Sequence, residues 1–269
     1  MSCILLPHSE RTVGELRLAF SFQGRKYLSS AIEQERVRLR DSILTNTSSA
    51  RIAEKTLLIS RLGAKNDGKT DCRAAFAKAI RKASAMKGAK IVVPAGTYYI
   101  KGPIVLASNV CIELQKGATL KFAPEEKYYP VVSITNSPFW CVHLLKSENI
   151  ICRNLRYDAK LMNNDGIDPE CSRNVLIEGV EFNNGDDNVA IKSGRDNDGW
   201  NAKMPSENII IRNCHFKGLH AVVIGSEMSA GVRNVIVEDC DYAGYCKRGI
   251  FIKTNPDRGG FAENVYVKN

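Results

Sequence analysis

Apolar residues recur at every second position in short stretches of the second half of the chain. The stretches carry Ile150 and Cys152, Val175 and Ile177, Ile209 and Ile211, and Val235 and Val237, with β-branched residues dominating. A period of two with β-branched side chains is typical of β-strands, whereas an amphipathic helix repeats about every 3.6 residues. The sequence therefore predicts a series of short strands in this half.

The strands belong to an internal repeat. Each copy starts at an asparagine and has an aromatic residue eight positions later: Asn149 and Tyr157, Asn174 and Phe182, Asn208 and Phe216, Asn234 and Tyr242, with a fifth copy starting at Asn264. The unequal intervals do not fit a propeller or a helical array of fixed period. Stacked parallel coils would place equivalent residues about 4.8 Å apart. The repeat therefore predicts an all-β fold, a right-handed parallel β-helix, with asparagines and aromatics in two structural columns.

A third set of aligned positions is polar. When the isoleucines Ile167, Ile191, Ile224 and Ile252 are aligned, the residues four positions earlier are Asn163, Asp187, His220 and Arg248, and those one position later are Asp168, Lys192, Gly225 and Lys253. Polar residues on successive coils predict a groove along one face. A solvated face without function has the same pattern.

The acidic residues favour the groove. Asp186 and Asp187 are adjacent and follow Gly185, and Asp165, next to Gly166, falls one coil below. Carboxylates crowded within a few ångströms cannot all ionise with ordinary pKa values. One of them should keep its proton and serve as a general acid, which is the chemistry of a polysaccharide-cleaving site.

The first half of the chain predicts a cap and the first coils. Thr70 is expected to cap an amphipathic helix over residues 71–87, with Ala75, Phe76, Ala79 and Ile80 facing inward. Turns rich in Gly, Pro and Asn then separate expected strands at 91–93, 97–100, 104–106, 110–114 and 119–122. The helix would cover the open end of the core, where unpaired strand edges invite aggregation.

Residues 1–56 match none of this, so we expect a separate, disordered or helical N-terminal segment and a β-helix catalytic domain over 57–269. The segment contains a charged stretch with helical character from Tyr27 to Asp41. The first eleven residues lack the apolar run and the cleavage site of a signal peptide.

Composition fits one domain with a single large core, because 44% of the 269 residues are hydrophobic. The net charge of +9 fits scattered surface cations or attraction to an acidic polymer. Basic residues form no run longer than two, so no nucleic-acid partner is predicted, and no segment predicts a membrane span. The nine cysteines show no zinc-type spacing and are expected to be buried small hydrophobic residues.

Several blocks carry a family resemblance. The sequence GAKNDGKTDCRAAFAKAI, followed by VVPAGTYYIKGPIVLASNVCIELQKGATL, resembles the start of pectin-lyase-type β-helix enzymes. The blocks NSPFWCVHLL, NNDGIDPECSRNVLIEGVEFNNGDDNVAIKSG, HAVVIGSEMSAGVRNV and RGIFIKTNPDRGG together resemble the polygalacturonases, glycoside hydrolase family 28. The resemblance covers about residues 60–269.

The resemblance implies a catalytic set and a reaction. It implies inverting hydrolysis of α-1,4-galacturonosyl linkages in pectin, with exo action as one option and without a metal or other cofactor. Asp186 would protonate the leaving oxygen, Asp165 and Asp187 would activate water, and His220 would tune the acid. Lys253 would hold the substrate carboxylate, and Asn163 is a further binding candidate. The implied protein is a monomer acting on an acidic polysaccharide or oligosaccharide in a secreted or periplasmic location.

The sequence also departs from the family pattern. Asn164 replaces a threonine, Leu219 and Ala221 replace the glycines that flank His220, and Phe251 replaces an arginine that grips the galacturonate carboxylate. Arg248 or Arg258 is expected to take over that grip. EEKYYPVV runs directly into SITNSPFW where family members usually carry several further coils, and the chain stops in mid-repeat. These departures suggest an internally shortened and C-terminally truncated member.

Two alternatives therefore stay open. A catalytically weak or inactive carbohydrate-binding relative fits the truncations and Phe251. A β-helix lyase or epimerase would need a calcium-binding acid cluster and a basic proton abstractor.

Overall fold

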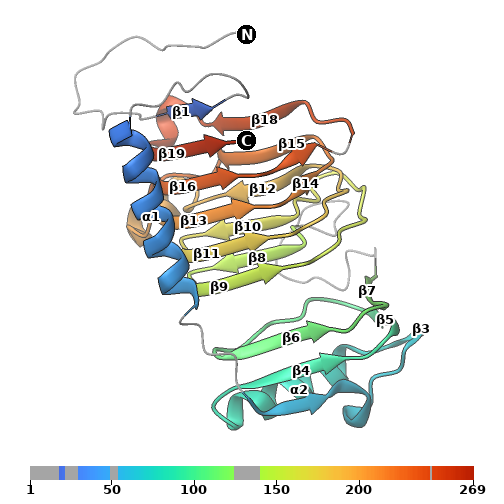
Figure 1. Cartoon of the computed structure of the whole chain (residues 1–269). Helices are drawn as coiled ribbons and strands as arrows, with labels where there is room; N and C mark the ends of the chain where they lie inside the picture. Colours follow the sequence, from blue (N-terminus) through green and yellow to red (C-terminus); the bar gives the residue numbers. More distant parts are fainter. Residues whose placement is uncertain (1–17, 22–29, 49–53, 124–139, 243) are drawn as a thin grey trace.

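The computed structural model describes residues 18–21, 30–48, 54–123, 140–242 and 244–269. Every named strand pairing among them is parallel, and the strands stack as successive coils of a β-helix (Figure 1). The predicted fold class is confirmed. None of the helices in this described part combines the length and the apolar character needed to span a bilayer.

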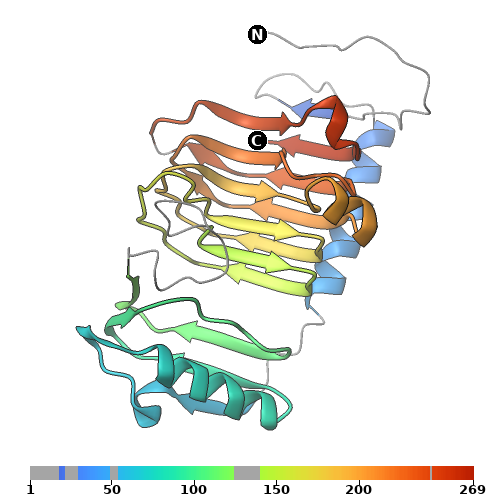
Figure 2. The same cartoon turned by 180° about the vertical axis from the view of Figure 1, so that it is seen from behind.

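The first coils form two three-stranded sheets with a helical cap. One sheet consists of β2 (Thr56–Leu58), β4 (Ala89–Val93) and β6 (Val110–Leu114), and the other of β3 (Asp67–Asp71), β5 (Gly96–Ile100) and β7 (Ala118–Phe122). The 3-10 helix η1 (Ile59–Leu62) and helix α2 (Arg73–Ala85) complete this part, and α2 lies at its outer end (Figure 2). The four predicted inward residues of α2 are all buried. The predicted cap is thus present.

Two local expectations for this part are wrong. Residues 104–106 form no strand: Val105 is 76% exposed and Leu106 is also exposed, while Ile104 packs against the core of the first coils. Thr70 does not cap α2, since its hydroxyl donates to Asp67 Oδ2 at 2.6 Å. The carboxylate of Asp71 instead accepts a hydrogen bond from the Arg73 amide at 3.0 Å, which satisfies a free N–H at the start of the helix.

The later coils form a larger stack with its own core. Its six-stranded sheet contains β1 (Leu18–Ser21), β19 (Ala262–Lys268), β16 (Val232–Glu238), β13 (Ser206–Arg212), β11 (Arg173–Glu178) and β9 (Glu148–Arg153). Its five-stranded sheet contains β18 (Arg248–Lys253), β15 (His220–Gly225), β12 (Asp187–Ile191), β10 (Ile167–Glu170) and β8 (Val142–Leu145). The short strands β14 (His215–Phe216) and β17 (Asp241–Tyr242), helix α3 (Asn197–Ala202) and the 3-10 helix η3 (Pro256–Arg258) complete the stack.

The sheets of the two stacks are not continuous. The first sheets end at β6 and β7, and the later ones begin at β8 and β9. The hydrophobic residues likewise form one core cluster in each stack. Residues 124–139, which contain the junction where the family pattern predicts further coils, lie outside the described residues.

Both predicted structural columns are present. The side-chain amides of Asn149, Asn174, Asn208, Asn234 and Asn264 join in a ladder in which each Nδ2 donates to the Oδ1 below it at 2.9 to 3.1 Å. The rings of Tyr157, Phe182 and Phe216 stack with centroids 5.3 and 5.6 Å apart, and Tyr242 follows at 6.0 Å. The repeat therefore identified side chains that contact one another across coils.

The asparagine ladder gives a stability prediction. Asn208 has a φ of 58°, which asparagine tolerates better than leucine does, and it hydrogen-bonds to Asn174 and Asn234. We expect Asn208→Leu to lower the free energy of unfolding by about 1 to 3 kcal/mol for each neighbour left unpaired. Chemical denaturation measures the change, and Asn208→Gly separates the lost hydrogen bonds from the backbone strain. An Asn208→Leu variant as stable as the exposed control Asn201→Leu would contradict a stabilising ladder.

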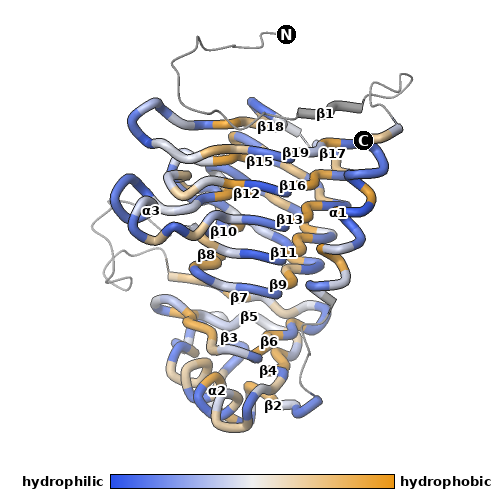
Figure 3. Tube along the Cα trace, turned by 90° about the vertical axis from the view of Figure 1, so that its left-hand side faces the viewer, coloured by the Kyte–Doolittle hydropathy of each residue, from blue (hydrophilic) through white to orange (hydrophobic). Residues whose placement is uncertain are grey.

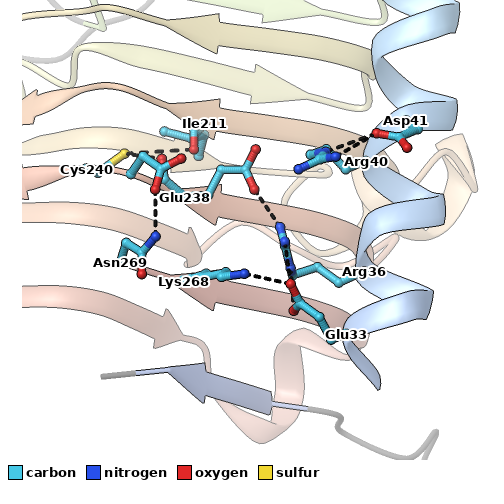
Figure 4. Close-up of polar contacts among 10 residues, drawn as sticks. Glu33, Arg36, Arg40, Asp41, Ile211, Glu238, Cys240, Lys268 and Asn269 are labelled. Atoms are coloured by element: carbon cyan, nitrogen blue, oxygen red, sulfur yellow. Dashed lines mark hydrogen bonds and ion pairs between the residues drawn. The ribbon is translucent and has the colours of Figure 1, made fainter. Parts of the chain in front are cut away.

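Helix α1 (Ser30–Ser48) covers the outer face of the six-stranded sheet. Ile43 packs with Leu176, Ile210 and Ile236, which point away from the main core. The Arg36 guanidinium, whose side chain is only 3% exposed, pairs with Glu33 and Glu238 (Figure 4). Residues 30–41 of the charged stretch lie in this helix, which is packed against the sheet along β9, β11, β13 and β16 (Figure 3).

Alternating charges border the apolar stripe under α1. At the ends of neighbouring strands, Arg153, Glu178, Arg212, Glu238 and Lys268 lie in register. Glu178 contacts both arginines beside it at 2.6 Å. Opposite charges in cross-strand positions stabilise a sheet. The charges on this face therefore largely neutralise one another.

Candidate active site

Strand pairing in the five-stranded sheet fixes which groove residues are neighbours. Ile191 pairs with Ile224, and Ile224 pairs with Ile252, as the alignment of isoleucines predicts. Ile167, however, pairs with Val189 rather than with Ile191. The sequence alignment is therefore wrong by two residues in the lowest of these coils.

The corrected register changes two columns. When the pairing of Ile167 with Val189 is continued two residues towards the N-terminus, Asp165 rather than Asn163 lies beside Asp187. The acid column is thus Asp165, Asp187, His220 and Arg248. In the second column Glu170 takes the place expected for Asp168, so that Glu170, Lys192, Gly225 and Lys253 are in register.

Close approach of the coils explains the glycines beside the acids. A Cβ at Gly166 would lie 2.4 Å from the Asn188 carbonyl oxygen, and one at Gly185 would lie 2.1 Å from the Leu161 carbonyl oxygen. The Asn184 side chain ties the two turns together, because its Nδ2 donates to the Asn164 oxygen at 2.8 Å and to the Asp187 oxygen at 2.9 Å. These contacts set the relative positions of Asp165 and the acidic pair.

The upper part of the site is a chain of hydrogen bonds across three coils. His220 Nδ1 lies 2.7 Å from Asp187 Oδ1, and both side chains are almost completely buried. Arg248 Nη1 lies 3.0 Å from His220 Nε2. Asp186, which is partly exposed, accepts a hydrogen bond from the Asp187 amide at 3.0 Å. His220 therefore contacts Asp187 directly, whereas the resemblance implies that it tunes Asp186.

Cations and an aromatic ring border the acidic pair from the coil above. Lys253 Nζ lies 3.9 Å from Asp187 Oδ2, as the predicted orientation of Lys253 into the groove requires. The Arg248 guanidinium lies over the Phe251 ring, 4.4 Å from its centroid, and that ring is 5.1 Å from the His220 ring. Phe251 therefore faces the groove and packs against two members of the site.

The lower part of the site contains a buried lysine. Lys192 Nζ lies 3.4 Å from Asp165 Oδ2 and 3.2 Å from Glu227 Oε2, and only 5% of the lysine side chain is exposed. The same ammonium lies 4.4 Å above the Trp140 ring. Lys192 thus provides a positive charge next to Asp165. It stands directly after a buried isoleucine in the sequence, but its partners are distant in the chain.

Burial sets the protonation of the site acids. It raises the pKa of Asp165 to about 7 against the opposing effect of Lys192, and the charges of Asp187 and Asp186 raise it further. Burial also raises the pKa of Asp186, and the adjacent Asp187 adds to this, while Lys253 opposes it. The sequence predicts that crowded acids retain protons, and the direction of these pKa shifts is as predicted. Loss of hydration, however, raises the two pKa values more than the neighbouring carboxylates do.

Asp168 is a fourth acid beside the site that sequence reasoning gave no catalytic role. It is fully buried, and its two carboxylate oxygens have no hydrogen-bond partner within the described part of the chain. Burial holds its pKa well above the ordinary value. The carboxylates of Asp168, Asp165 and Glu227 in turn outweigh the effect of burial on Lys192 and keep the pKa of that lysine above its usual range.

The two remaining binding candidates make no hydrogen bond or ion pair with the site aspartates in the described part of the chain. Arg258 Nε pairs with Asp196 Oδ1 at 3.0 Å, and its Nη1 donates to the Ser226 oxygen at 3.3 Å. Asn163 makes no hydrogen bond to the three catalytic candidates among the described residues. Eight cysteines in the described part are free thiols, and Cys3 lies outside it.

The cluster also has the spacing of a metal site. One ligand atom each from Asp186, Asp187 and His220 lies within 4.8 Å of the others. Arg248 and Lys253, however, place two positive charges against His220 and Asp187. Repulsion from these charges opposes the entry of a metal cation. The cluster is therefore better suited to proton transfer between the carboxylates and the imidazole than to metal binding.

Known proteins resemble this chain over most of its length. A family model described as glycosyl hydrolases family 28 matches residues 48–269. A probable polygalacturonase of Vitis vinifera is 38% identical over 141 residues, 51% of this chain and 28% of the relative. An endo-polygalacturonase of Pectobacterium carotovorum subsp. carotovorum is 32% identical over 140 residues, 51% of this chain and 33% of the relative. The chain thus spans about a third or less of these relatives.

A solved structure resembles more of the chain. The hyperthermoactive exopolygalacturonase of Thermotoga maritima has a TM-score of 0.71 and 26% identity to this chain. The match covers 87% of this chain and 80% of that protein.

Proposed function

The chain belongs to glycosyl hydrolases family 28, and we propose that it hydrolyses α-1,4-galacturonosyl linkages in pectin or polygalacturonate. The observation that carries the proposal is that Asp165, Asp186 and Asp187 lie on adjacent coils with cations beside them. The proposed acid, Asp186, has a raised pKa, which a general acid requires, and the cations suit a substrate with carboxylates.

The reaction needs one proton donor and one proton acceptor. Asp186 gives its proton to the glycosidic oxygen as the bond from the sugar carbon to that oxygen breaks. Asp165 and Asp187 hold a water molecule, which attacks the same carbon from the opposite face and gives its proton to one of these two carboxylates. A carboxyl pair that performs both transfers with a water between them inverts the configuration. No metal or other cofactor takes part in this scheme.

The cations supply affinity for an acidic sugar. Lys253, next to Asp187, is the proposed contact for the galacturonate carboxylate. Arg258 is a second cation near the groove, and its present pairing with Asp196 would have to open for it to meet substrate. Asn163 stays a candidate for a hydrogen bond to a sugar hydroxyl. The substrate is an acidic polymer or oligomer, and we expect a monomeric protein in a secreted or periplasmic location.

Trp140 supports action from the chain end. Its ring covers Lys192, and it meets the His143 ring edge-on with centroids 4.9 Å apart. His143 is itself held by Glu170 at 2.6 Å. These side chains lie on the coil below Asp165, where a polymer that continued past the acids would have to lie. Their bulk there supports an exo mode of cleavage, in which only a few sugar residues fit on that side.

Product analysis tests the proposed reaction. Purified protein incubated with polygalacturonate and with oligogalacturonides should release new reducing ends without unsaturated products. Unsaturated products would identify a lyase. Phe251 in place of the family arginine favours an inactive carbohydrate-binding relative as the second candidate, and binding of the same substrates without any turnover would identify it. Release of monosaccharides before the polymer shortens would support the exo mode.

Lys253→Met tests the substrate class. The change removes the proposed contact with the substrate carboxylate, a charge-assisted hydrogen bond worth about 1.5 to 3 kcal/mol. We expect the KM for an acidic oligosaccharide to rise by about 10- to 150-fold, with a smaller effect on a neutral one. Lys116→Met, on an exposed turn of the first coils, is the matched control. An equal effect on acidic and neutral substrates would overturn the galacturonate assignment.

A further inference from the structure

The contacts of Arg248 differ from those of a free substrate-binding cation. One guanidinium nitrogen lies 3.0 Å from His220 Nε2, and the guanidinium rests on the Phe251 ring. A guanidinium group can donate hydrogen bonds but cannot accept them. His220 Nε2 must therefore offer its lone pair to Arg248, and the imidazole proton must reside on Nδ1.

The proton on Nδ1 has a defined destination. Nδ1 lies 2.7 Å from Asp187 Oδ1, so His220 donates to Asp187. Asp187 is thereby kept as a hydrogen-bond acceptor, with Lys253 beside its second oxygen. In the opposite tautomer, the Nδ1 lone pair would face the carboxylate, and a proton would have to move onto Asp187 to restore the hydrogen bond.

We infer that Arg248 is a positioning residue that fixes the tautomer of His220 and thereby keeps the proton of the acidic pair on Asp186. Phe251 contributes by holding the guanidinium in place from its open face. The effect of Arg248 on catalysis rests on the proposed function, whereas the tautomer of His220 does not. Phe251, which departs from the family pattern, then has a role in the site. Arg248 supports the acids instead of binding the substrate.

Register explains why these residues meet. His220 pairs with Arg248 and Val223 pairs with Phe251 across β15 and β18. Arg248 and Phe251 thus lie on the same coil, with Arg248 directly above His220 and Phe251 above Val223. Gly249 between them leaves room for the Tyr242 hydroxyl, which a Cβ would approach to 2.1 Å. The hydrogen-bonded chain from Arg248 to Asp187 follows the stacking direction of the solenoid.

Several charged groups surround the hydrogen bonds that run from Arg248 through His220 to Asp187. They contribute to the pH dependence of kcat. They are Asp165 and Asp186 from the lower coils, Asp187 below His220, and Arg248 and Lys253 from the coil above. Removing the Arg248 charge makes ionisation of the nearby carboxyls less favourable. The pH profile of kcat should therefore move to higher pH in Arg248→Met.

Nitrogen NMR of labelled histidine tests the tautomer without any activity measurement. The chain has four histidines, and His220→Gln assigns the signal of His220. We expect a protonated Nδ1 and an unprotonated Nε2 in the parent protein at neutral pH, and a protonated Nε2 in Arg248→Met. Arg156→Met, which removes a largely exposed guanidinium elsewhere, should leave the spectrum unchanged. A parent spectrum with a proton on Nε2, or the same His220 spectrum in Arg248→Met, would overturn the inference.

Kinetics distinguish positioning from substrate binding. We expect kcat of Arg248→Met to fall by about tenfold or more, the scale on which partners that orient catalytic side chains act, with little change in KM. Arg248→Lys should restore part of the loss. A raised KM for acidic substrates with an unchanged kcat and pH profile would make Arg248 a carboxylate contact instead. If the parent protein turns over no galacturonan, the proposed function fails, while the NMR result still decides the tautomer.

Discussion

Asp186→Asn should reduce turnover of polygalacturonate by about 10² to 10⁴, the contribution of a positioned general acid, and leave the fold intact. The amide cannot give a proton to the leaving oxygen. Asparagine nevertheless retains an oxygen that can accept from the Asp187 amide, the hydrogen bond that Asp186 makes now at 3.0 Å. Single-turnover rates on an oligogalacturonide, with circular dichroism as the measure of folding, report the two effects separately.

The controls for this variant come from the same chain. Asp198→Asn makes the same chemical change on the exposed helix α3 and should leave turnover unchanged. Asp165→Asn and Asp187→Asn should be comparably harmful, because each removes part of the water activation. Near-normal turnover by Asp186→Asn would show that the acid is another residue, and the raised pKa of Asp165 would make that residue the next candidate.

The sequence predicted the stacking of the coils because the repeat marks equivalent positions directly. Asn149, Asn174, Asn208 and Asn234 hydrogen-bond in the predicted order. The sequence predicted the register of the catalytic coils less well. Pro169 takes the place in β10 that Ile191 has in β12, so that aligning isoleucine with isoleucine shifts the coil by two residues. A turn of unknown length precedes each strand, and sequence alone gives no measure of that length.

The strand sequences indicate that the outer face of the six-stranded sheet is covered, as it is by α1. This indication is hard to see because the two-residue period of the inward-facing residues dominates the pattern. Leu176, Ile210 and Ile236 lie between the inward-facing residues and are themselves apolar. A run of consecutive apolar residues in a strand indicates burial on both faces over that run. These strands therefore required a cover, although nothing in their sequence says that residues 30–48 provide it.

The site acids were identifiable by type and spacing, whereas their protonation was not. The pKa of Asp165 depends on burial between coils and on Lys192, a residue more than one coil away in the sequence. The contacts of Arg248 and Phe251 with His220 are likewise a product of register. Electrostatics of this kind depend on three-dimensional distances that a linear pattern does not contain.

Lys192→Met should destabilise the protein strongly, and more so as the pH rises. The lysine pairs with Asp165 and Glu227 while almost fully buried. Removing one partner of a buried ion pair leaves an uncompensated charge and costs about 3 to 5 kcal/mol of unfolding free energy. A carboxyl whose pKa is raised by folding favours the folded state below its unfolded pKa and loses that advantage as the pH rises to the folded pKa. The loss should therefore be larger at pH 7 than at pH 5.

The same variant reports on the role of Asp165. If Asp165 is the base, activity of the parent should increase with pH up to about 7, where its carboxyl ionises. Without Lys192 the pKa of Asp165 should be higher still, so the acid limb of the pH profile should move upward. Lys90→Met, which breaks the exposed pair with Glu113, is the control and should change stability little. An unchanged acid limb, in a variant that remains folded at pH 5, would mean that Lys192 stabilises the coils without setting the charge of the base.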